Sequence, residues 1–456
     1  MAAVEPGFPR PNPTTSWWLQ KAQAAALLGK GYRTTPELPS SSDVTIVGSG
    51  LSGAATAYFL LTSQSPPASV TLIEAREICD GATGRNGGHC RPDCYRDYTH
   101  YKAEFGKEQA LKIIQNEMDT LDLLEELVRK EGIDCDFWRG FSYDVPMDEE
   151  GAAFLSASYE EFAADGGPVD IITRILDPAQ AAKVTRCPRA TASYKFPAGS
   201  LFPYKLVQNL LDLCVRKHGL NIQSQTPVRK VTQEGNRWSL HTDRGIVDSA
   251  KVVFAMNAFT STLLPEFSGH IWPFKGQCSA VLPPKSYLGN IALQCTYSLN
   301  YGDYLIQRPS DDIIIFGGAR RAVPVEQLLG NTDDESLLPA MTDTLKSSLP
   351  AYFADWAEGE GEVLHVWSGI MGYTSSGIPF VGEIHDKPGA FVCAGHHGHG
   401  MARILTAARG LAAVIQGAPW AETGLPECFQ PSKERLEGAA RGRAVVHNIG
   451  KQDVVG

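Results

Sequence analysis

Three segments of the chain combine glycine with residues that could bind a ligand or move a proton. They are a GxGxxG run at residues 48–53, the sequence GATGRNGGH at 81–89 and the sequence GHHGHGM at 395–401. Glycine lets a backbone approach a ligand closely, and histidine changes its charge near neutral pH. The three segments therefore indicate a site built largely from backbone, with proton transfer at its histidine-rich end.

The GxGxxG run has the surroundings of a dinucleotide-binding turn. It follows the β-branched run 44–47 and precedes the alanine-rich helical pattern 54–61, and a further apolar run, 70–73, ends at Glu74. In such a βαβ unit the first glycine makes the tight turn, the second admits a pyrophosphate, and the third lets helix and strand pack closely. The acidic residue can bind an unmodified ribose. A glycine-rich turn without a ligand is the alternative interpretation.

Residues 81–89 favour a flavin over a nicotinamide. This second glycine-dense loop offers a cation and amides but little that could fill a core. A nicotinamide enzyme has no evident use for such a loop, whereas the tricyclic ring and ribityl chain of FAD need close backbone approach. We therefore expect FAD.

The third segment joins a strand to a helix. The apolar residues 391–394 precede the glycine–histidine turn, and 404–415 follow it with a helical pattern. The N-terminus of that helix could present N–H groups to the pyrimidine end of a reduced flavin, where negative charge develops. A zinc site made by the three histidines is an alternative, but they crowd one turn and lack a ligand from a separate element. We expect no metal.

The remaining elements must hold these segments in place. An amphipathic pattern at 100–131 predicts a long surface helix, and 206–215 predicts another. Short strands that would form a small antiparallel sheet returning to the βαβ unit are expected at 221–223, 228–231, 238–242 and 247–254. A second sheet is expected from 279–282, 304–307 and 313–316.

We therefore predict an α/β fold with an added antiparallel sheet. A Rossmann-like cofactor domain would be assembled from separated segments beside a second, sheet-based substrate domain. The expected parts are an N-terminal arm at 1–40, a cofactor-binding domain at 41–100, 196–265 and 356–425, a substrate domain at 101–195 and 266–355, and a C-terminal tail at 426–456.

Charge and cysteine content exclude several other classes. The chain has 456 residues and a formal charge of −10, which argues against nucleic acid or an anionic membrane as a general partner. Ten cysteines without a CxxC pair suit reduced thiols inside a cell. Pro9, Pro11 and Pro13 interrupt the continuous apolar stretch that a secretory signal would need. No apolar window reaches the length of a membrane span. We expect a cytoplasmic enzyme.

Several motifs together resemble the FAD-dependent D-amino-acid-oxidase-like family, which includes glycine, sarcosine and gamma-glutamylputrescine oxidases. In chain order they are DVTIVGSGLSGAATAYFL, LIEA, GATGRNGGH, WSG with YT and IPFVG, and AGHHGHGM. The resemblance covers most of residues 40–425, and GATGRNGGH is most similar to the gamma-glutamylputrescine oxidase branch and its fungal relatives. It implies an FAD domain and a substrate domain whose antiparallel sheet roofs the flavin.

The implied reaction is hydride transfer from a carbon bearing an amine to the flavin. The resulting imine hydrolyses, and O2 reoxidises the flavin to give H2O2. The substrate would be a small amine or amino acid. Two alternatives stay open: a flavin dehydrogenase or biosynthetic flavoenzyme that acts on a C–OH or ring carbon with another acceptor, and a flavin-binding protein without activity.

The resemblance and the motifs together assign residues to the site. Cofactor contacts are expected from Gly48, Gly50, Leu51, Ser52, Gly53, Glu74, Ala75, Arg76, Ala82, Thr83, Arg85, Asn86, Gly87, Gly88, His89, Val228, Asn257, Gly369, Gly395, His397, Gly398, His399, Gly400 and Met401. Catalytic roles are expected of His399, His397, His89 and Arg320, with His399 as the first candidate for the base.

Three of these assignments carry alternatives. His89 could attach FAD covalently, as a histidine in this part of the chain does in some related amine-oxidising flavoproteins, or could act without a bond. His397 and His399 could tune charge near the ring or only pack the turn. Arg320 could face the flavin or lie at a solvated strand end. Ser376 stands where many relatives have Asp, so the polar contact of that carboxylate is absent or different.

Overall fold

The computed structural model describes residues 5–22, 26–300 and 302–438. The described helices are α1 (Trp17–Ala22), α2 (Leu51–Leu61), α3 (Tyr98–Glu131), α4 (Glu149–Ala164), α5 (Pro178–Thr185), α6 (Pro203–His218), α7 (Thr260–Leu263), α8 (Pro339–Tyr352), α9 (Ile404–Ile415) and α10 (Lys433–Glu437). The described strands are β1 (Ser41–Val47), β2 (Val70–Ile73), β3 (His89–Cys90), β4 (Trp138–Val145), β5 (Thr173–Ile175), β6 (Ser193–Ser200), β7 (Asn221–Gln223), β8 (Val228–Glu234), β9 (Arg237–Thr242), β10 (Gly245–Phe254), β11 (Ile271–Leu282), β12 (Thr296–Leu299), β13 (Asp303–Gln307), β14 (Ile314–Gly318), β15 (Glu362–Thr374), β16 (Phe380–Glu383) and β17 (Ala390–Ala394).

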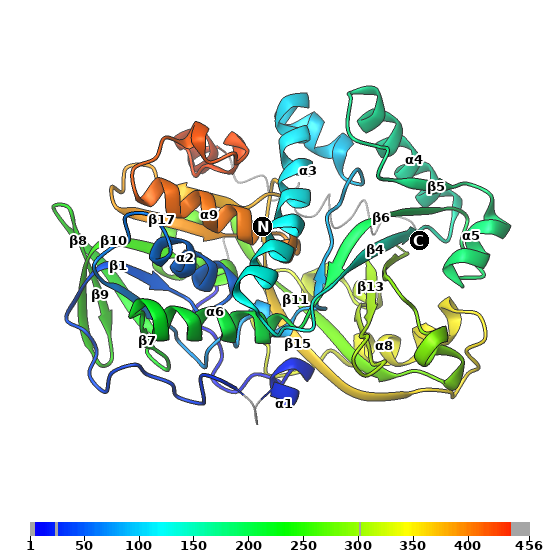
Figure 1. The fold of residues 1–456 in the computed structure, drawn as a ribbon, viewed down its shortest axis with the longest axis horizontal. Coiled ribbons are helices and arrows are strands. Elements are labelled where there is room, and N and C mark those ends of the chain that lie inside the picture. The colour runs from blue at the N-terminus through cyan, green and yellow to red at the C-terminus, as the bar shows by residue number, and fades with distance from the viewer. Residues whose placement is uncertain (1–4, 23–25, 301, 439–456) are drawn as a thin grey trace.

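The first sheet is a Rossmann-like parallel sheet. Its strand order is β16-β17-β10-β1-β2-β7, and β17, β10, β1, β2 and β7 run parallel. Helices α2, α6 and α9 pack on one face, and Figure 1 shows them together in the half of the molecule that holds this sheet. Strands β8 and β9 extend antiparallel from β10 and cover the other face. The βαβ unit is confirmed, and β8 and β9 return antiparallel on β10 as expected. The expectation that 221–223 and 247–254 belong to a separate antiparallel sheet is wrong, because β7 pairs parallel with β2 and β10 pairs parallel with β1.

The second sheet is largely antiparallel and makes up the other half of the molecule (Figure 1). Its order is β15-β11-β14-β13-β12-β4-β6-β3, with β12 and β4 parallel. Helix α8 packs on it through Met341, Leu345 and Leu349. The predicted fold class, a Rossmann-like domain with a second sheet-based domain, is confirmed.

Two elements belong to a different half of the molecule than the expected segment boundaries assign them to. Strand β15 falls in the third expected cofactor segment, yet it pairs along its length with β11 of the second sheet. Helix α3 falls in the expected substrate segment, yet it packs against α9 of the first half, where Asn116 Nδ2 donates to Thr406 Oγ1 at 3.0 Å. Long elements therefore tie the two halves together across those boundaries.

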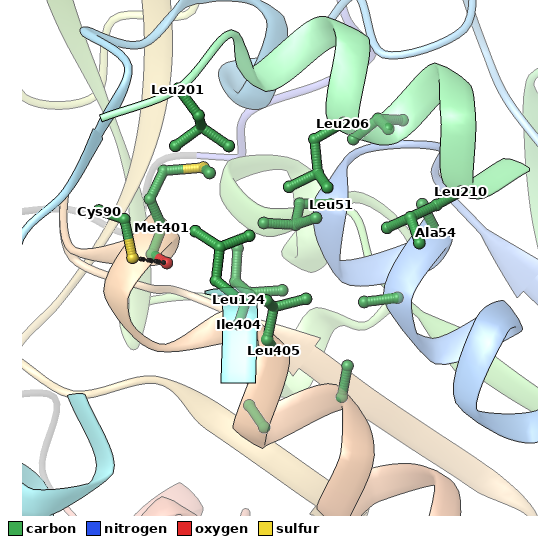
Figure 2. Close-up of a cluster of buried hydrophobic side chains, with 14 of the residues drawn as sticks. Leu51, Ala54, Cys90, Leu124, Leu201, Leu206, Leu210, Met401, Ile404 and Leu405 are labelled. Atoms are coloured by element: carbon green, nitrogen blue, oxygen red, sulfur yellow. Dashed lines mark hydrogen bonds between the residues drawn. The ribbon is translucent and has the colours of Figure 1, made fainter. Parts of the chain in front are cut away.

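A buried apolar cluster fixes the starts of α2 and α9 relative to each other. Figure 2 shows side chains from α2, α3, α6 and α9 meeting in one place: Leu51, Ala54, Leu124, Leu206, Leu210, Ile404 and Leu405. Each is buried, and burying one such large aliphatic side chain stabilises the fold by about 1.5–3 kcal/mol. The two glycine turns that precede these helices are thereby held on one rigid support.

Two remaining expectations concern membranes and cysteines. None of the described helices is both long enough and apolar enough to cross a bilayer. The ten cysteines are free thiols, in agreement with the absence of a disulfide framework. Burial raises the pKa of Cys90 to about 12, and its Sγ donates to the Met401 carbonyl at 3.3 Å (Figure 2). Cys90 is thus an unreactive packing residue.

Candidate active site

One cavity of about 870 Å³ brings the three glycine segments together. It lies beyond the carboxyl ends of β1 and β2 and extends under the second sheet to β11, β13 and β15. Every predicted site residue lines it except Gly53, Gly88 and Gly395, which lie behind the wall. The sequence-based grouping of distant segments into one site is therefore reproduced in space.

The first turn requires glycine for steric reasons. Gly48 has a φ of 108°, and a Cβ there would lie 2.6 Å from the Ala255 carbonyl oxygen. A Cβ on Gly53 would lie 1.9 Å from the Gly48 carbonyl oxygen, so this glycine allows α2 to pack against the turn. The Leu51 N–H, in the first turn of α2, donates to Thr83 Oγ1 at 3.0 Å. The helix N-terminus thus opens toward the cavity beside the second glycine loop.

Glu74 lies directly after β2, at the edge of the cavity. Its Oε2 accepts hydrogen bonds from the Ser49 N–H at 2.9 Å and from Ser49 Oγ at 2.6 Å, and its Oε1 accepts from the Arg76 N–H at 2.9 Å. These bonds hold the carboxylate against the first turn, where it can meet the hydroxyls of a ribose.

The second loop is held by Arg85, whose role is internal. Its Nη2 donates to Asp80 Oδ1 at 2.6 Å, and its Nε donates to the Asp80 carbonyl at 2.9 Å. Trp367 Nε1 donates to the Arg85 carbonyl at 2.7 Å. A Cβ on Gly369 would lie 3.0 Å from Arg85 Cβ, so β15 passes close to this loop. Arg85 therefore shapes the cavity wall rather than offering a free cation.

His89 is a neutral residue in the wall. Its Nε2 lies 3.0 Å from the Leu305 carbonyl oxygen, and its ring meets Tyr304 edge-on with centroids 5.2 Å apart. Since a carbonyl can only accept, Nε2 carries the proton. Burial lowers the pKa of His89 to about 3. Both roles predicted for His89, covalent and noncovalent, stay predictions.

The third turn is fixed by bonds from other elements. Asn257 Oδ1 accepts from the Gly395 N–H at 3.0 Å. His397 has a φ of 52°, and its Nδ1 accepts from the Thr374 N–H at 3.0 Å while its ring stacks on Tyr373 at 4.3 Å. Burial lowers the pKa of His397 well below its usual value. His397 is therefore a neutral imidazole whose Nδ1 is occupied by the backbone.

His399 is paired with a buried carboxylate. Its Nδ1 lies 3.4 Å from Asp93 Oδ2, and Asp93 Oδ1 lies 2.5 Å from Arg96 Nη2 and 3.5 Å from Arg91 Nη1. Burial lowers the pKa of His399 to about 3, and Arg403 and Arg96 add to the effect against the pull of Asp93. The three neighbouring arginines hold the pKa of Asp93 well below its usual range. The result is a neutral imidazole beside an ionised carboxylate.

A second buried ion pair supports this arrangement. Arg403 Nε lies 2.6 Å from Glu117 Oε1, and Glu117 Oε2 accepts from the Asp93 N–H at 2.6 Å. Arg403 also donates to Tyr101 Oη and to the Gly377 carbonyl, each at 2.7 Å. Burial raises the pKa of Glu117 to about 7. This network was not predicted from the sequence. Its charged residues nevertheless lie close to the glycine segments: Arg91, Asp93 and Arg96 come soon after residue 89, and Arg403 comes two residues after Met401.

Comparison with known proteins places the chain among flavoenzymes. The model of the DAO family, FAD dependent oxidoreductases, matches residues 43–414. The chain belongs to this family. It is 23% identical to gamma-glutamylputrescine oxidoreductase from Escherichia coli over an alignment of 388 residues. This alignment covers 82% of this chain and 84% of that protein. It is 25% identical over 367 residues to glycine oxidase from Geobacillus kaustophilus, covering 79% and 89% of the two chains.

Solved structures of DAO-family enzymes have the same fold. The crystal structure of the Geobacillus kaustophilus glycine oxidase aligns with a TM-score of 0.69 at 22% identity, over 86% of this chain and 99% of that one. L-proline dehydrogenase from P. horikoshii aligns with a TM-score of 0.67 at 19% identity, over 86% and 98%. The protein is therefore an FAD-dependent oxidoreductase, and the resemblance inferred from the motifs is confirmed.

The residues in the cavity fit FAD, the cofactor of the DAO family. Two helix N-termini, those of α2 and α9, open into one elongated cavity from glycine turns. Gly48, Ser49 and Gly50 line the cavity, so the first turn presents backbone to a bound group. Glu74 and the histidine turn both line this cavity, and His396 Nε2 lies 3.1 Å from Ser52 Oγ at the start of α2.

The possible metal ligands have other partners. Among the described residues, Asp93, Asp97 and His399 bring ligand atoms within 4.8 Å of one another. Arg91 and Arg96 lie beside Asp93, and their charge opposes a cation there. The three histidines of the turn do not converge, because His396 faces Ser52, His397 binds the Thr374 backbone and His399 faces Asp93. Their arrangement disfavours the zinc alternative.

The structure shows the surroundings of Arg320 and the polar contact of Ser376, which the sequence left open. Arg320 is half-buried and lines the cavity, with its guanidinium carbon 5.8 Å from the centroid of the Phe274 ring, so it is no fully solvated strand end. Ser376 Oγ lies 3.1 Å from Arg435 Nη2. Ser376 therefore anchors the chain near α10.

Proposed function

We propose that this DAO-family protein oxidises the C–N bond of a small amine or amino acid and passes the electrons to O2. The names of two relatives, gamma-glutamylputrescine oxidoreductase and glycine oxidase, support an amine or amino-acid substrate, and the second supports oxygen as acceptor. The observation that carries the proposal is the neutral His399 imidazole at the cavity wall, backed by the Asp93 carboxylate. For a primary amine, the substrate, O2 and water give a carbonyl compound, ammonia and H2O2.

His399 can orient the substrate nitrogen once the amine is neutral, because its lowered pKa leaves it a hydrogen-bond acceptor rather than a strong base. An amine that arrives as an ammonium ion cannot release hydride until it is neutral. His399 Nδ1 faces Asp93, which leaves Nε2 to accept a hydrogen bond from the substrate's nitrogen. Asp93 and its arginines hold the ring in that orientation. When bound, FAD would supply the acceptor for the hydride, which carries both electrons.

Other wall residues complete the proposed site. Asp97 lines the cavity beside this pair and can attract a cationic amine. His397 can present its protonated Nε2 to the cavity because Nδ1 accepts a backbone N–H. Arg320 places a positive charge in the wall, which would favour the reduction of oxygen. We place the enzyme in the cytoplasm, in keeping with its free thiols.

Anaerobic mixing tests the reaction class directly. Purified holoprotein is mixed without oxygen with a panel of primary amines, secondary amines and amino acids, and with matched hydroxy compounds, while the flavin absorbance is followed. We expect bleaching with at least one nitrogen compound, then H2O2 on admission of air. Bleaching by hydroxy compounds alone would contradict the proposed C–N oxidation. Bleaching by an amine without H2O2 in air would replace O2 with another electron acceptor.

A substitution tests the role of His399. His399→Gln should lower the anaerobic rate of flavin reduction by about 100-fold, because the group that positions the substrate nitrogen for hydride release is lost. Since the pKa of His399 lies near 3, the wild-type rate between pH 6 and 9 should rise with deprotonation of the substrate, not of the histidine. His218→Gln, at the exposed end of α6, is the matched control. A His399→Gln protein with bound flavin and wild-type reduction at every pH would remove His399 from the mechanism.

A further inference from the structure

The N-terminal segment 5–22 lies outside the region that the DAO family model matches, yet it lines the cofactor cavity. The family match begins at residue 43, whereas Gly7, Phe8 and Pro9 all contribute to the cavity wall. We call residues 7–18 the N-terminal arm. Its contacts follow the cavity from one end toward the other.

The outer part of the arm lies at the end of the cavity formed by β8 and α7. Thr262 Oγ1 donates to the Gly7 carbonyl at 2.5 Å, and the guanidinium of Arg229 lies 4.9 Å from the centroid of the Phe8 ring. Thr262 and Val228, the neighbour of Arg229, line the cavity themselves. Phe8 is 39% exposed, so its ring closes the cavity end with one face open to solvent.

The middle of the arm is tied to the residues that follow Glu74. Arg76 Nη1 donates to the Arg10 carbonyl at 3.1 Å and also lies 2.8 Å from Asp334 Oδ2. The Asn12 N–H donates to Glu335 Oε1 at 2.9 Å. The loop 333–336, which sequence analysis leaves without a role, therefore holds the arm beside the ribose-binding end of the first sheet.

The inner part of the arm supports the second glycine loop. Ser16 Oγ donates to the Gly84 carbonyl at 2.5 Å, and Trp18 Nε1 donates to the Asn86 carbonyl at 2.7 Å. Trp18 is fully buried and packs against Phe202 with ring centroids 4.8 Å apart. Arg85 Nη1 also donates to the Thr14 carbonyl. This part of the arm lies behind the wall and braces it, because its polar groups are paired with the loop 84–86.

We infer that the N-terminal arm is part of the cofactor site: residues 7–9 close the adenosine end of the FAD cavity, and residues 14–18 fix the loop 84–86 along the dinucleotide. The contacts at residues 7–9 are an aromatic ring, proline and backbone, which suit the uncharged adenosine better than a phosphate. FAD should therefore be shielded from solvent at its pyrophosphate by an element that lies outside the matched family domain.

Enzymatic cleavage of bound FAD measures this shielding whether or not the flavin is covalently attached. A phosphodiesterase that splits FAD into FMN and AMP is added to the full-length holoprotein, and released AMP is quantified over time. The test proteins are Phe8→Ala and a chain that lacks residues 1–12. The matched control is Leu176→Ala, which removes another exposed apolar side chain, 53% exposed, from the loop after β5. The unfolding temperature of each protein is measured in parallel.

We expect AMP release from the shortened chain to be at least about tenfold faster than from wild type, the factor that corresponds to about 1.4 kcal/mol. Phe8→Ala should give a smaller increase and Leu176→Ala none. If the shortened chain does not fold, Phe8→Ala decides alone, since its side chain is on the surface. AMP release at the wild-type rate from the folded test proteins would overturn the inference, also when their unfolding temperature falls, because the arm would then be only a structural brace.

Discussion

Two glycine turns of the molecule perform similar tasks in different ways. The turn after β1 leads into α2, and the turn after β17 leads into α9, and both open into the same cavity. Residues 48–53 contain no titratable side chain, and their glycines are enforced by contacts with nearby backbone. Residues 395–401 contain three histidines and are held by Asn257, Asp93 and Ser52 from other elements.

This difference matches the roles proposed for the two turns, cofactor binding at the first and reaction at the second. A dinucleotide needs only backbone N–H groups and space, which glycine provides locally. A proton acceptor needs a defined tautomer and orientation, which buried polar partners provide. We therefore expect substitutions at the second turn to act through charge and pH, and substitutions at the first turn to act through steric fit.

The largest effect is expected from Arg403→Met, which breaks the buried ion pair below the second turn. Glu117 would keep its buried carboxyl without the cation 2.6 Å away, and breaking such a pair costs about 3–5 kcal/mol. The free energy of unfolding is measured by urea titration. The matched change at the start of the other helix, Leu51→Met, should cost less than about 1.5 kcal/mol. Equal losses of unfolding free energy in Arg403→Met and Leu51→Met would contradict the proposed difference between the two turns.

A double variant sharpens this prediction. In Arg403→Met with Glu117→Gln, the uncompensated carboxyl is gone, so the combined loss should be smaller than the sum of the two single losses. Additive losses would mean that the two side chains act independently, despite their contact.

A smaller effect on stability, but loss of the cofactor, is expected from Gly53→Ala. The added Cβ would lie 1.9 Å from the Gly48 carbonyl oxygen, so α2 must move away from the turn, at a cost of about 1–3 kcal/mol. Flavin content after purification and the unfolding free energy are the measurements. Gly29→Ala is the control, because a Cβ there meets nothing within 4 Å. Normal flavin content in Gly53→Ala would show that the turn tolerates a side chain.

Near pH 6 the smallest effect is a pH dependence that only the second turn should show. His396 is 4% exposed, and burial lowers its pKa to about 3. The unfolded chain therefore binds a proton near pH 6.5 that the folded chain does not bind until about pH 3, so acid favours unfolding in that window. The contribution is fully present above pH 6.5 and falls by up to about 1.4 kcal/mol per pH unit below it.

The pH prediction is tested with His396→Asn. Unfolding free energies at several pH values between 4 and 7 should fall less steeply in the variant than in wild type. Glu117, whose pKa is raised to about 7, works in the opposite direction in both proteins and so cancels in the difference. Identical slopes would mean that His396 is protonated in the fold, and the proposed neutral turn would be wrong.

The sequence by itself determined the family, the cofactor and the first turn. Gly48, Gly53 and Glu74 could be assigned because their roles depend on neighbours within one βαβ unit, where the backbone path follows from local pattern. The strand at 70–73 and the helix at 404–415 also have the predicted bounds. Local steric requirements can therefore be recognised from the residue types alone.

Only the tertiary structure decided the electrostatics of the reacting end and the role of the N-terminal arm. Asp93 contacts His399, which lies 306 residues further along the chain, and Glu117 contacts Arg403, which lies 286 residues further. No rule of local sequence spacing could therefore have paired them. Phe8 and Trp18 belong to a segment that is irregular in sequence, yet Phe8 lines the cavity and Trp18 binds the Asn86 carbonyl of the second glycine loop. The physical reason is that burial and charge pairing depend on which surfaces meet, and that is set by packing between elements rather than within them.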